Sequence, residues 1–312
     1  MADPVRPARL LVLRGGAVGD FIVTLPALHA LRQRWPDAHL EVIGYPHVAR
    51  LATWFSLANR ARSLDEARIA RYFAENARIH DEDQAYFASF DAVINYLHDP
   101  QQILAGNLKR CGVKVHLPAS PLVTTTHAID HFLAPLTSLA IYPDDHASPL
   151  TVPAHHRRTA DKPWIALHPG SGGTKKCWPL AHYLALARRL AAETPLTPVF
   201  ITGDAERERY SDLDHALAGF TRLHHPPLDE LAAELTSASA YLGNDAGITH
   251  LAATVGTPTL ALFGPTNPSL WAPRGPRVHV LTAPGGDLHH LAIETVWSAL
   301  EALLPPSQRK QL

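Results

Sequence analysis

The chain has 312 residues, of which 46% are hydrophobic and 18% are charged, and its formal net charge is −1 at pH 7. This length predicts two domains of about 150 residues each, and the composition is that of a globular rather than a disordered protein. A nearly neutral chain lacks the broad positive surplus of nucleic-acid-binding proteins, so we expect no nucleic-acid partner.

The sequence contains no stretch of about 20 uninterrupted apolar residues that would span a bilayer, and residues 1–9 lack the apolar centre of a signal peptide. We therefore expect a cytoplasmic protein. The two cysteines, Cys111 and Cys177, are too few and too far apart to indicate a disulfide framework or a zinc site. Several of the 20 histidines fall in adjacent pairs, whose side chains diverge, so we expect no metal site from them.

The first half of the chain alternates short apolar segments with helical patterns. Strands are expected at 9–14, 39–44, 90–96 and 113–117, and helices at 21–35, about 101–110 and 128–139. Pro26 lies near the start of the first helix, where it is either tolerated or causes a kink. Buried strands separated by helices imply right-handed crossovers and a parallel sheet covered on both faces.

Between residues 142 and 163 the apolar pattern breaks down into Pro, Asp, His and Arg, which indicates a linker. The alternation then restarts. Strands are expected at 164–168, 198–202, 240–245, 259–263 and 277–281, and helices at 180–192, after Asp204, at 228–235, after Asp245 and at 291–304. The pattern predicts an α/β protein with two doubly wound, Rossmann-like domains, 1–155 and 156–312. Such sheets bind ligands at the carboxyl ends of their strands, so two facing domains would share a cleft.

The first glycine-rich loop follows the opening strand. Gly15, Gly16 and Gly19 are wrongly spaced for the Gly-x-Gly-x-x-Gly pattern, which argues against dinucleotide binding. Asp20 instead brings a carboxylate to the start of the next helix, where it is either an N-cap or a general base that removes a proton from an acceptor hydroxyl. We assign Gly16 and Gly19 to acceptor binding, because glycines let the backbone turn tightly there.

The second glycine-rich loop, residues 168–179, follows the first strand of the second domain. It is not a Walker loop, because Gly-x-x-x-x-Gly-Lys-Ser/Thr is absent. Its glycines let the backbone approach a ligand closely, and its side chains offer hydroxyls and positive charge. The candidate donor-binding residues of this loop are Ser171, Gly172, Thr174, Lys175 and Lys176. Such a loop suits a departing diphosphate, whose developing charge a lysine would stabilise. The alternative is a solvated turn.

Residues 243–253 form a junction between a strand and a helix. The first N–H groups of a helix have no internal partner, and the helix dipole adds a partial positive charge, so such a junction suits a phosphate or diphosphate. We expect the N–H groups of Ala246 and Gly247 to face this anion. Asp245 either accepts hydrogen bonds from sugar hydroxyls beside the phosphate or only caps the helix.

A further loop closes the strand 259–263. Its Gly-Pro pair forces a fixed turn, and a hydroxyl follows that could contact a nucleotide. The candidate donor-binding residues here are Gly264, Pro265 and Thr266.

Metal-dependent sugar transfer often uses Asp-x-Asp, which occurs here at 81–83 and 212–214. Residues two apart on a helix face different directions, and the first copy has no strand before it, so neither is expected to bind a metal.

Taken together and in this order, these segments resemble glycosyltransferase family 9, the heptosyltransferases that add heptose to the lipopolysaccharide inner core of Gram-negative bacteria. The resemblance covers nearly the whole chain. Its motifs are Gly19-Asp20 followed by Leu25-Pro26-Ala27-Leu28, Pro169-Gly170 through Lys176 with Trp178-Pro179, Asp245-x-Gly247-x-x-His250, and Phe263-Gly264-Pro265-Thr266.

The resemblance implies a GT-B fold, with an N-terminal acceptor domain and a C-terminal donor domain facing a central cleft. It further implies an inverting transfer from ADP-heptose that needs neither a metal nor another cofactor. Asp20 would be the catalytic base, Lys176 would meet the diphosphate and Asp245 would hold the heptose. Ala246 and Gly247 would offer N–H groups to the phosphates, and His250 would support the pocket. In this fold the last helix usually crosses back, so part of 291–304 would pack on the first domain.

The implied acceptor is a Kdo or heptose of the lipopolysaccharide inner core, with Arg60 and Arg62 as candidates for gripping it. Ala246 departs from the family, which usually has Thr or Ser there. Two alternatives stay open: a nucleotide-sugar 2-epimerase, which would act on the donor without an acceptor, and a catalytically inactive nucleotide-sugar-binding protein. We expect a monomer, and peripheral contact with the inner membrane is an open question.

Overall fold

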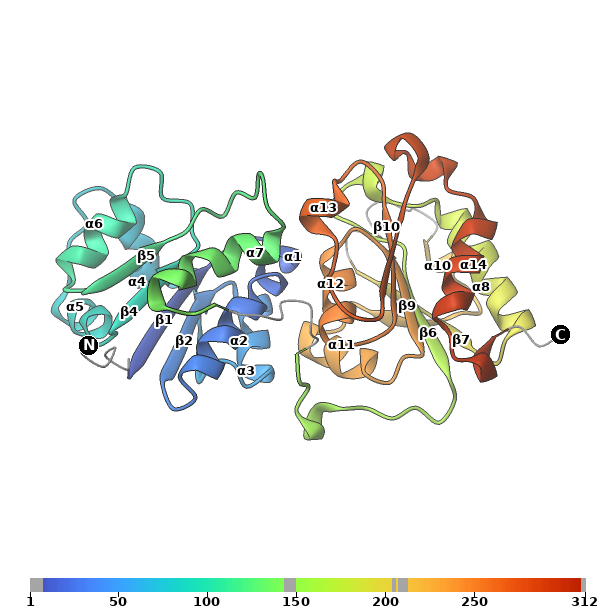
Figure 1. Cartoon of the computed structure of the whole chain (residues 1–312), viewed down its shortest axis with the longest axis horizontal. Helices are drawn as coiled ribbons and strands as arrows, with labels where there is room; N and C mark the ends of the chain where they lie inside the picture. The colour runs from blue at the N-terminus through green and yellow to red at the C-terminus, as the bar shows by residue number, and fades with distance from the viewer. Residues whose placement is uncertain (1–7, 143–149, 204–205, 207–212, 310–312) are drawn as a thin grey trace. The chain divides into compact units, whose positions relative to one another are not determined.

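The computed structural model describes residues 8–142, 150–203, 206 and 213–309. The chain forms two compact units, Met1–His146 and Ala147–Leu312 (Figure 1). The division falls inside the segment that the sequence indicates as a linker. Each unit is built on its own parallel β-sheet.

The first unit contains a five-stranded sheet in the order β3-β2-β1-β4-β5, and every neighbouring pair is parallel. The strands are β1 (Arg9–Arg14), β2 (His39–Gly44), β3 (Arg60–Ser63), β4 (Ala92–Asn95) and β5 (Val115–Pro118). Four of them fall on the predicted segments. The sequence pattern missed β3, because an edge strand with two arginines in four residues carries no apolar run.

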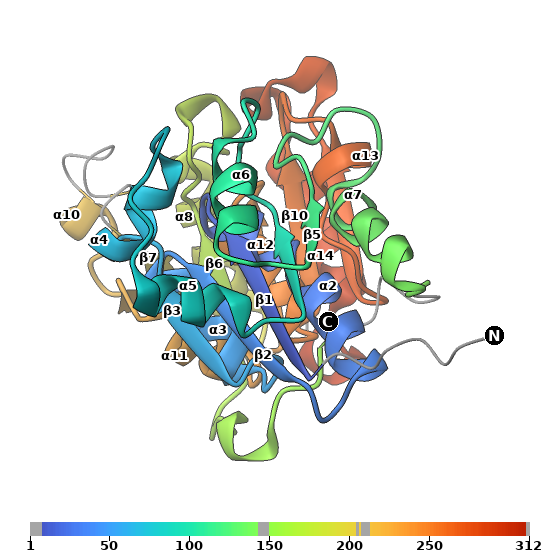
Figure 2. The ribbon, with the colours of Figure 1, turned by 90° about the vertical axis from the view of Figure 1, so that its left-hand side faces the viewer.

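Helices cover both faces of this sheet. They are α1 (Val18–Ile22), α2 (Leu25–Arg34), α3 (Pro46–Trp54), α4 (Ala67–Ala70), α5 (Asp81–Ala88), α6 (Ile103–Arg110) and α7 (Ala128–Leu133), with 3₁₀ turns η1 (Arg71–Phe73) and η2 (Ala134–Leu139). In Figure 2 this unit faces the viewer, and α5 and α6 lie in front of the sheet. Phe87, Leu104 and Leu108 pack there in one buried cluster with Leu11 and Val93 of the strands.

Two predicted helices are interrupted at prolines. The continuous helix predicted at 21–35 is wrong, because α1 ends at Ile22 and α2 begins at Leu25 with Pro26 in its first turn. A proline ring has no N–H and clashes with the carbonyl four residues earlier, so the first helix cannot run through it. The segment 128–139 likewise changes from α to 3₁₀ geometry at Ala134, next to a proline.

The second unit contains a six-stranded parallel sheet in the order β11-β10-β9-β6-β7-β8. The strands are β6 (Trp164–His168), β7 (Thr197–Thr202), β8 (Thr221–His224), β9 (Ala240–Asn244), β10 (Thr259–Phe263) and β11 (Val278–Thr282). The sequence pattern missed β8, which is again a polar edge strand.

Helices flank this sheet too. They are α8 (Leu180–Glu193), α10 (Leu213–Ala216), α11 (Leu228–Leu235), α12 (Gly247–Thr254), α13 (Pro268–Trp271) and α14 (Ile293–Leu303), with 3₁₀ turns η3 (Ala154–His156), η4 (Thr174–Lys176), η5 (Pro284–Gly286), η6 (Leu288–His290) and η7 (Pro306–Gln308). Figure 1 shows α11 and α12 on one side of the sheet and α8 and α14 on the other. Val296, Trp297 and Leu300 of α14 lie in the core of this unit. Most of the segment after Asp204 lies outside the described residues.

The strand order places one crevice in each sheet. In a doubly wound sheet, ligands bind beyond the carboxyl ends of the two strands at which the direction of winding reverses. These strands are β1 and β4 in the first unit and β6 and β9 in the second. Over the described part of the chain, no helix combines the length and the apolar character needed to cross a bilayer.

Gly44 offers a test of how tightly the carboxyl ends of β1 and β2 are packed. A Cβ at this position would lie 2.7 Å from the backbone carbonyl oxygen of Arg14, whereas a Cβ at Gly106 on α6 would meet nothing within 4 Å. We expect Gly44→Ala to lower the free energy of unfolding by about 1–3 kcal/mol, because the backbone of β1 must shift. The matched control Gly106→Ala should raise it by about 0.5–1 kcal/mol through helix propensity. Urea unfolding measures both, and similar losses in the two variants would contradict the packing argument.

Candidate functional site

The candidate donor site of the second unit lies at the carboxyl edge of its sheet. The register pairs His168 of β6 with Gly243 of β9, and Asn244 of β9 with Leu262 of β10. The three strands therefore end at nearly the same level, and the loops that follow them begin side by side. These are the three loops in which the sequence analysis placed donor-binding residues, so the sheet brings them together.

Asp245 and Lys176 form an ion pair in this site. The Lys176 Nζ lies 2.8 Å from Asp245 Oδ2, with 39% of the lysine side chain and 9% of the aspartate side chain exposed. A pair that is partly withdrawn from water interacts more strongly than one on the open surface. The two residues predicted to act on a diphosphate and its sugar thus lie in direct contact, although 69 positions separate them.

The carboxylate of Asp245 does not cap the following helix. The N-cap position of α12 belongs to Ala246, which has extended backbone angles and no side-chain cap hydrogen bond, and Gly247 is the first residue of the helix. The interpretation of Asp245 as a helix cap is therefore wrong. Because α12 begins without a side-chain cap, its first N–H groups remain suited to an anion.

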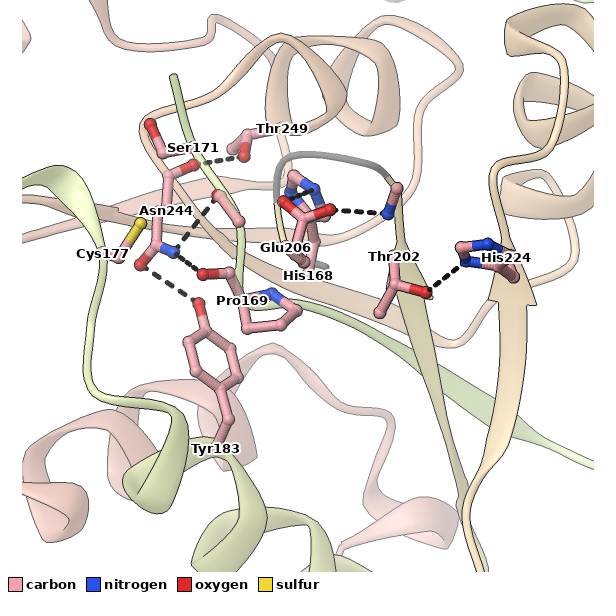
Figure 3. Close-up of polar contacts among 12 residues, drawn as sticks. His168, Pro169, Ser171, Cys177, Tyr183, Thr202, Glu206, His224, Asn244 and Thr249 are labelled. Carbon is pink, nitrogen blue, oxygen red and sulfur yellow. Dashed lines mark hydrogen bonds and ion pairs between the residues drawn. The ribbon is translucent and has the colours of Figure 1, made fainter. Parts of the chain in front are cut away.

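The side-chain amide of Asn244 fastens the donor loop to the end of β9, as Figure 3 shows. Its Nδ2 donates to the carbonyl oxygens of Pro169 at 2.9 Å and Gly170 at 3.3 Å. Its Oδ1 accepts from the Trp178 N–H at 3.0 Å and the Tyr183 hydroxyl at 3.2 Å. Asn244 is completely buried. One amide therefore holds both ends of the loop, a role that the sequence analysis did not assign to it.

Ser171 forms a further hydrogen bond between the loop after β6 and the turn after β9. The Ser171 Oγ donates to the backbone carbonyl of Asp245 at 2.6 Å, and the residue is buried. The sequence predicts that Ser171 offers its hydroxyl to the donor, but the structure directs this hydroxyl to the turn that carries Asp245. Its observed role is to position the turn.

The remaining residues predicted to bind the donor lie in the loop after β6, in α12 and after β10. Gly172, Thr174 and Lys175 are exposed in the loop after β6, and the last two belong to η4. His250 is buried in α12. The segment Gly264-Pro265-Thr266 directly follows β10, with Gly264 buried and Pro265 exposed.

Glu206 is a buried residue of this edge that the sequence analysis missed. Its Oε2 accepts the N–H of Gly203 at 2.6 Å, and its Oε1 lies 3.9 Å from His168 Nε2 (Figure 3). A Cβ at Gly170 would lie only 1.5 Å from the same carboxylate. The carboxylate thus contacts both the loop after β6 and the end of β7. A lone glutamate in a polar stretch gives no sequence signal for such a contact.

Asp20 lies in the corresponding loop of the first unit. It is the third residue of α1, and its Oδ2 accepts the N–H of Ala17 at 2.9 Å, so the carboxylate does satisfy one backbone group at the helix start. About a third of its side chain is exposed, which leaves room for a further partner. Gly16 has a φ of +93°, and a Cβ there would lie 2.8 Å from the Cβ of Asp20. Gly19 belongs to α1 itself.

Arg14 holds this loop in place through hydrogen bonds to its backbone. Its guanidinium donates to the carbonyl oxygen of Asp20 at 2.8 and 3.2 Å and to that of Tyr96 at 3.4 Å, and it lies 3.7 Å from Asp20 Oδ1. It also stands over the Phe132 ring at 4.3 Å. Burial lowers the pKa of Arg14 to about 10, although the nearby Asp20 favours the charged form. The arginine therefore remains a cation at neutral pH and ties β1, α1 and β4 together.

The two arginines proposed for acceptor binding lie on β3. Arg60 is exposed. Arg62 is 11% exposed, pairs with Glu66 and Glu41 and stands over the Tyr86 ring. The hydrogen bonds that it donates to Glu66 raise its pKa. Its guanidinium is thus already bound within the first unit.

The Asp-x-Asp segments have structural roles where they are described. Asp81 and Asp83 lie in the first turn of α5, where a negative charge interacts favourably with the helix dipole. Asp214 pairs with Arg222, and Asp212 lies outside the described residues. The described ranges contain no group of three or more His, Cys, Asp or Glu side chains that could hold a metal.

Replacing Asn244 tests the fastening of the donor loop. We expect Asn244→Ala to lower the free energy of unfolding by about 2–4 kcal/mol, because the buried N–H of Trp178 and the carbonyl of Pro169 lose their partner. Urea unfolding measures the loss. The exposed Asn267 is a control, since Asn267→Ala removes only a helix cap worth about 1 kcal/mol. Equal losses of stability in the Asn244→Ala and Asn267→Ala variants would contradict the fastening role.

Replacing Arg14 tests the support of the Asp20 loop. We expect Arg14→Met to cost about 1–3 kcal/mol of stability, because the carbonyls of Asp20 and Tyr96 lose a buried donor. Arg14→Lys should recover part of this loss, since an ammonium keeps the charge but not the planar fork. The exposed Arg78 provides the control, and Arg78→Met should change stability by less than about 0.5 kcal/mol. Equal stability of the Arg14→Met and Arg78→Met variants in urea would contradict this role.

Comparison with known proteins places the site in a family. The curated lipopolysaccharide heptosyltransferase 1 of Pseudomonas aeruginosa is 36% identical over 106 residues, which is 34% of this chain and 30% of the relative. Lipopolysaccharide heptosyltransferase 2 of Escherichia coli is 29% identical over 134 residues, 39% of this chain and 37% of the relative. The matched region thus spans about a third of the length of these relatives.

Solved structures match over nearly the whole chain and show the fold. The E. coli heptosyltransferase WaaC with ADP has a TM-score of 0.73 at 20% identity and covers 95% of this chain and 99% of that one. A glycosyltransferase family 9 protein from Veillonella parvula has a TM-score of 0.75 at 17% identity and covers 97% and 98%. The predicted fold class, GT-B with two Rossmann-like units, is confirmed. The family model of glycosyltransferase family 9 (heptosyltransferase) matches residues 140–297, half of the chain, and the protein therefore belongs to this family.

Proposed function

We propose that this protein is an inverting, metal-independent glycosyltransferase that moves a heptose from ADP-heptose to a lipopolysaccharide inner-core acceptor. The observation that carries the proposal is the contact between Lys176 and Asp245 beside the uncapped start of α12. This arrangement places a cation, backbone N–H groups and a carboxylate at the carboxyl ends of β6 and β9. Such a set suits a diphosphate joined to a hydroxylated ring.

The donor is assigned to the second unit. The N–H groups of Ala246 and Gly247 would bind the diphosphate, and Lys176 would balance the charge that develops as ADP departs. Asp245 would then accept hydrogen bonds from hydroxyls of the sugar. The exposed Thr174 and Lys175, together with Gly264, Pro265 and Thr266, would complete the nucleotide contacts, and His250 would support them from within α12. The relatives are named lipopolysaccharide heptosyltransferases, which supports heptose as the sugar.

The acceptor is assigned to the first unit, with Asp20 as the base. Its carboxylate would take the proton of an acceptor hydroxyl as that oxygen attacks the anomeric carbon from the face opposite to ADP. A single displacement of this kind inverts the configuration. Neutralisation of the leaving group by Lys176 and α12 would make a metal unnecessary. The proposal requires Asp20 and Lys176 to act on the same pair of reacting atoms.

We further propose a cytoplasmic location, where nucleotide sugars are available. The monomeric state and peripheral contact with the inner membrane stay predictions.

Asp20→Asn tests the base. The amide oxygen can still accept the N–H of Ala17, so the loop keeps its hydrogen bond while the basic group is lost. We expect heptose transfer to fall by about 10²–10⁴-fold with ADP binding nearly unchanged. Mass spectrometry of core oligosaccharides incubated with ADP-heptose measures transfer, and the exposed Asp65 supplies the control Asp65→Asn. Near wild-type turnover by the Asp20 variant would remove it from the role.

Metal removal tests the second half of the mechanism. We expect excess chelator to leave the transfer rate unchanged, because Lys176 and α12 take the place of a cation. Inhibition that added Mg²⁺ or Mn²⁺ reverses would contradict metal independence. In the same assay, conversion of ADP-heptose without any acceptor would favour an epimerase, and donor binding without product on any acceptor would favour an inactive binding protein.

A further inference from the structure

The ion pair between Lys176 and Asp245 joins two side chains to which the proposed function gives different halves of the donor. Lys176 would bind the diphosphate, whereas Asp245 would accept hydrogen bonds from the sugar. The Lys176 Nζ lies 2.8 Å from Asp245 Oδ2, so each side chain is the partner of the other. A donor that engages both of them therefore competes with their mutual contact.

Asp245 is the fixed member of the pair. Its N–H donates to the carbonyl oxygen of Leu262 at 2.9 Å, and its carbonyl oxygen accepts from the Ser171 hydroxyl at 2.6 Å. The preceding residue, Asn244, is completely buried and hydrogen-bonded to the loop after β6. Only 9% of the Asp245 side chain is exposed. The carboxylate is therefore held in place, with little of its surface open to water.

Lys176 is the member that can move. It is the last residue of the 3₁₀ turn η4, and 39% of its side chain is exposed. Its ammonium group lies at the end of a flexible four-carbon stem, so it can change its partner without a shift of the backbone. The pair therefore opens by movement of the lysine, while the carboxylate keeps its position.

Opening of the pair has a cost that falls on Asp245. A buried carboxylate that loses its cation keeps its charge without compensation, which costs free energy. In the described ranges of the chain, Lys176 is the one cation that pairs with this carboxylate. A diphosphate that draws Lys176 away also brings negative charge close to Asp245. A nucleoside diphosphate by itself thus gains the lysine but gives Asp245 no new partner.

A sugar attached to the diphosphate removes this cost. Its hydroxyl groups are neutral donors, and an ionised carboxylate is an acceptor that forms strong hydrogen bonds with them. The intact nucleotide sugar therefore supplies a new partner to each member of the pair, a phosphate to Lys176 and hydroxyls to Asp245. The nucleoside diphosphate that remains after transfer supplies only one of the two.

We propose that the Lys176–Asp245 ion pair is an exchange contact, which makes the site prefer an intact nucleotide sugar to the free nucleoside diphosphate. The inference rests on the proposed glycosyltransferase function and adds a role in specificity to these two residues. Re-formation of the pair after transfer favours release of the nucleoside diphosphate. The contact therefore acts against inhibition by this product.

A double-mutant cycle on the full chain tests the exchange, with ADP and ADP-heptose as the probes in calorimetric titrations without acceptor. We expect the wild type to bind ADP-heptose more tightly than ADP by about tenfold or more. Asp245→Asn removes the charge and keeps the shape of the side chain. It should raise the affinity for ADP about fivefold or more and reduce the preference for ADP-heptose to less than about threefold.

The same substitution in a Lys176→Met background isolates the ion pair. There Asp245→Asn relieves only the direct repulsion between the carboxylate and ADP. Its effect on ADP affinity should therefore be about fivefold smaller than in the chain that keeps Lys176. Lys175 is exposed, lies one position earlier and provides the matched control. Whatever Lys175→Met itself does to ADP affinity, Asp245→Asn should keep its full effect in that background.

An equal effect of Asp245→Asn on ADP affinity with and without Lys176 would overturn the proposal. A smaller effect with Lys176 present would overturn it as well, because the lysine would then bridge the carboxylate and the phosphate. So would a wild type that binds ADP as tightly as ADP-heptose. Thermal melting identifies a variant that fails to fold, and Asp245→Ser then replaces Asp245→Asn in the cycle. Wild-type protein that binds neither probe refutes the donor assignment itself, whereas binding of both probes without coupling refutes only the exchange.

Discussion

The buried amide of Asn244 is the contact on which the geometry of the candidate donor site depends. It donates twice to the start of the loop after β6 and accepts from the N–H of Trp178 at the end of that loop, so three hydrogen bonds of one side chain fix the loop against β9. A fourth, from the Tyr183 hydroxyl, ties α8 to the same amide. Its position one residue before Asp245 also fixes where the ion pair with Lys176 forms. Without this amide the loop would have to find other partners for several buried backbone groups. A completely buried side chain, Asn244, thus positions the solvent-accessible residues of the site.

In the first unit a buried cation, Arg14, holds the corresponding glycine-rich loop. Arg14 is buried at the end of β1 and donates to carbonyl groups on α1 and at the end of β4. Both units therefore place a polar side chain at the point where the sheet reverses its winding, and in both the glycine-rich loop lies directly above it. The difference is electrostatic, because a charged guanidinium lies beneath the carboxylate of Asp20 and a neutral amide lies beside the lysine-containing loop.

Much of this architecture could be predicted from the sequence, because apolar runs mark buried strands and glycine-rich segments mark the loops at their ends. The strands β3 and β8 were missed, since edge strands such as Arg60–Ser63 are polar. The break after Ile22 had a signal in Pro26, which the helical pattern outweighed. The family motifs implied that Lys176 and Asp245 serve one donor site, but not that they form an ion pair. The role of Asn244 had no sequence signal, because its partners lie 61 to 75 positions away. The convergence of Asp20 and Lys176 stays a prediction.

The glycines of the donor loop differ in what they tolerate, and this has a consequence for re-engineering the enzyme. Gly170 is pressed against the Glu206 carboxylate, so any side chain there would expel a buried acid. A methyl group added at Gly172 or Gly173 would meet no other atom within 4 Å, so nothing in the fold itself requires these two positions to be glycine. Substitutions that aim to change the nucleotide sugar can therefore be made at Gly172 and Gly173 without a clash, but not at Gly170.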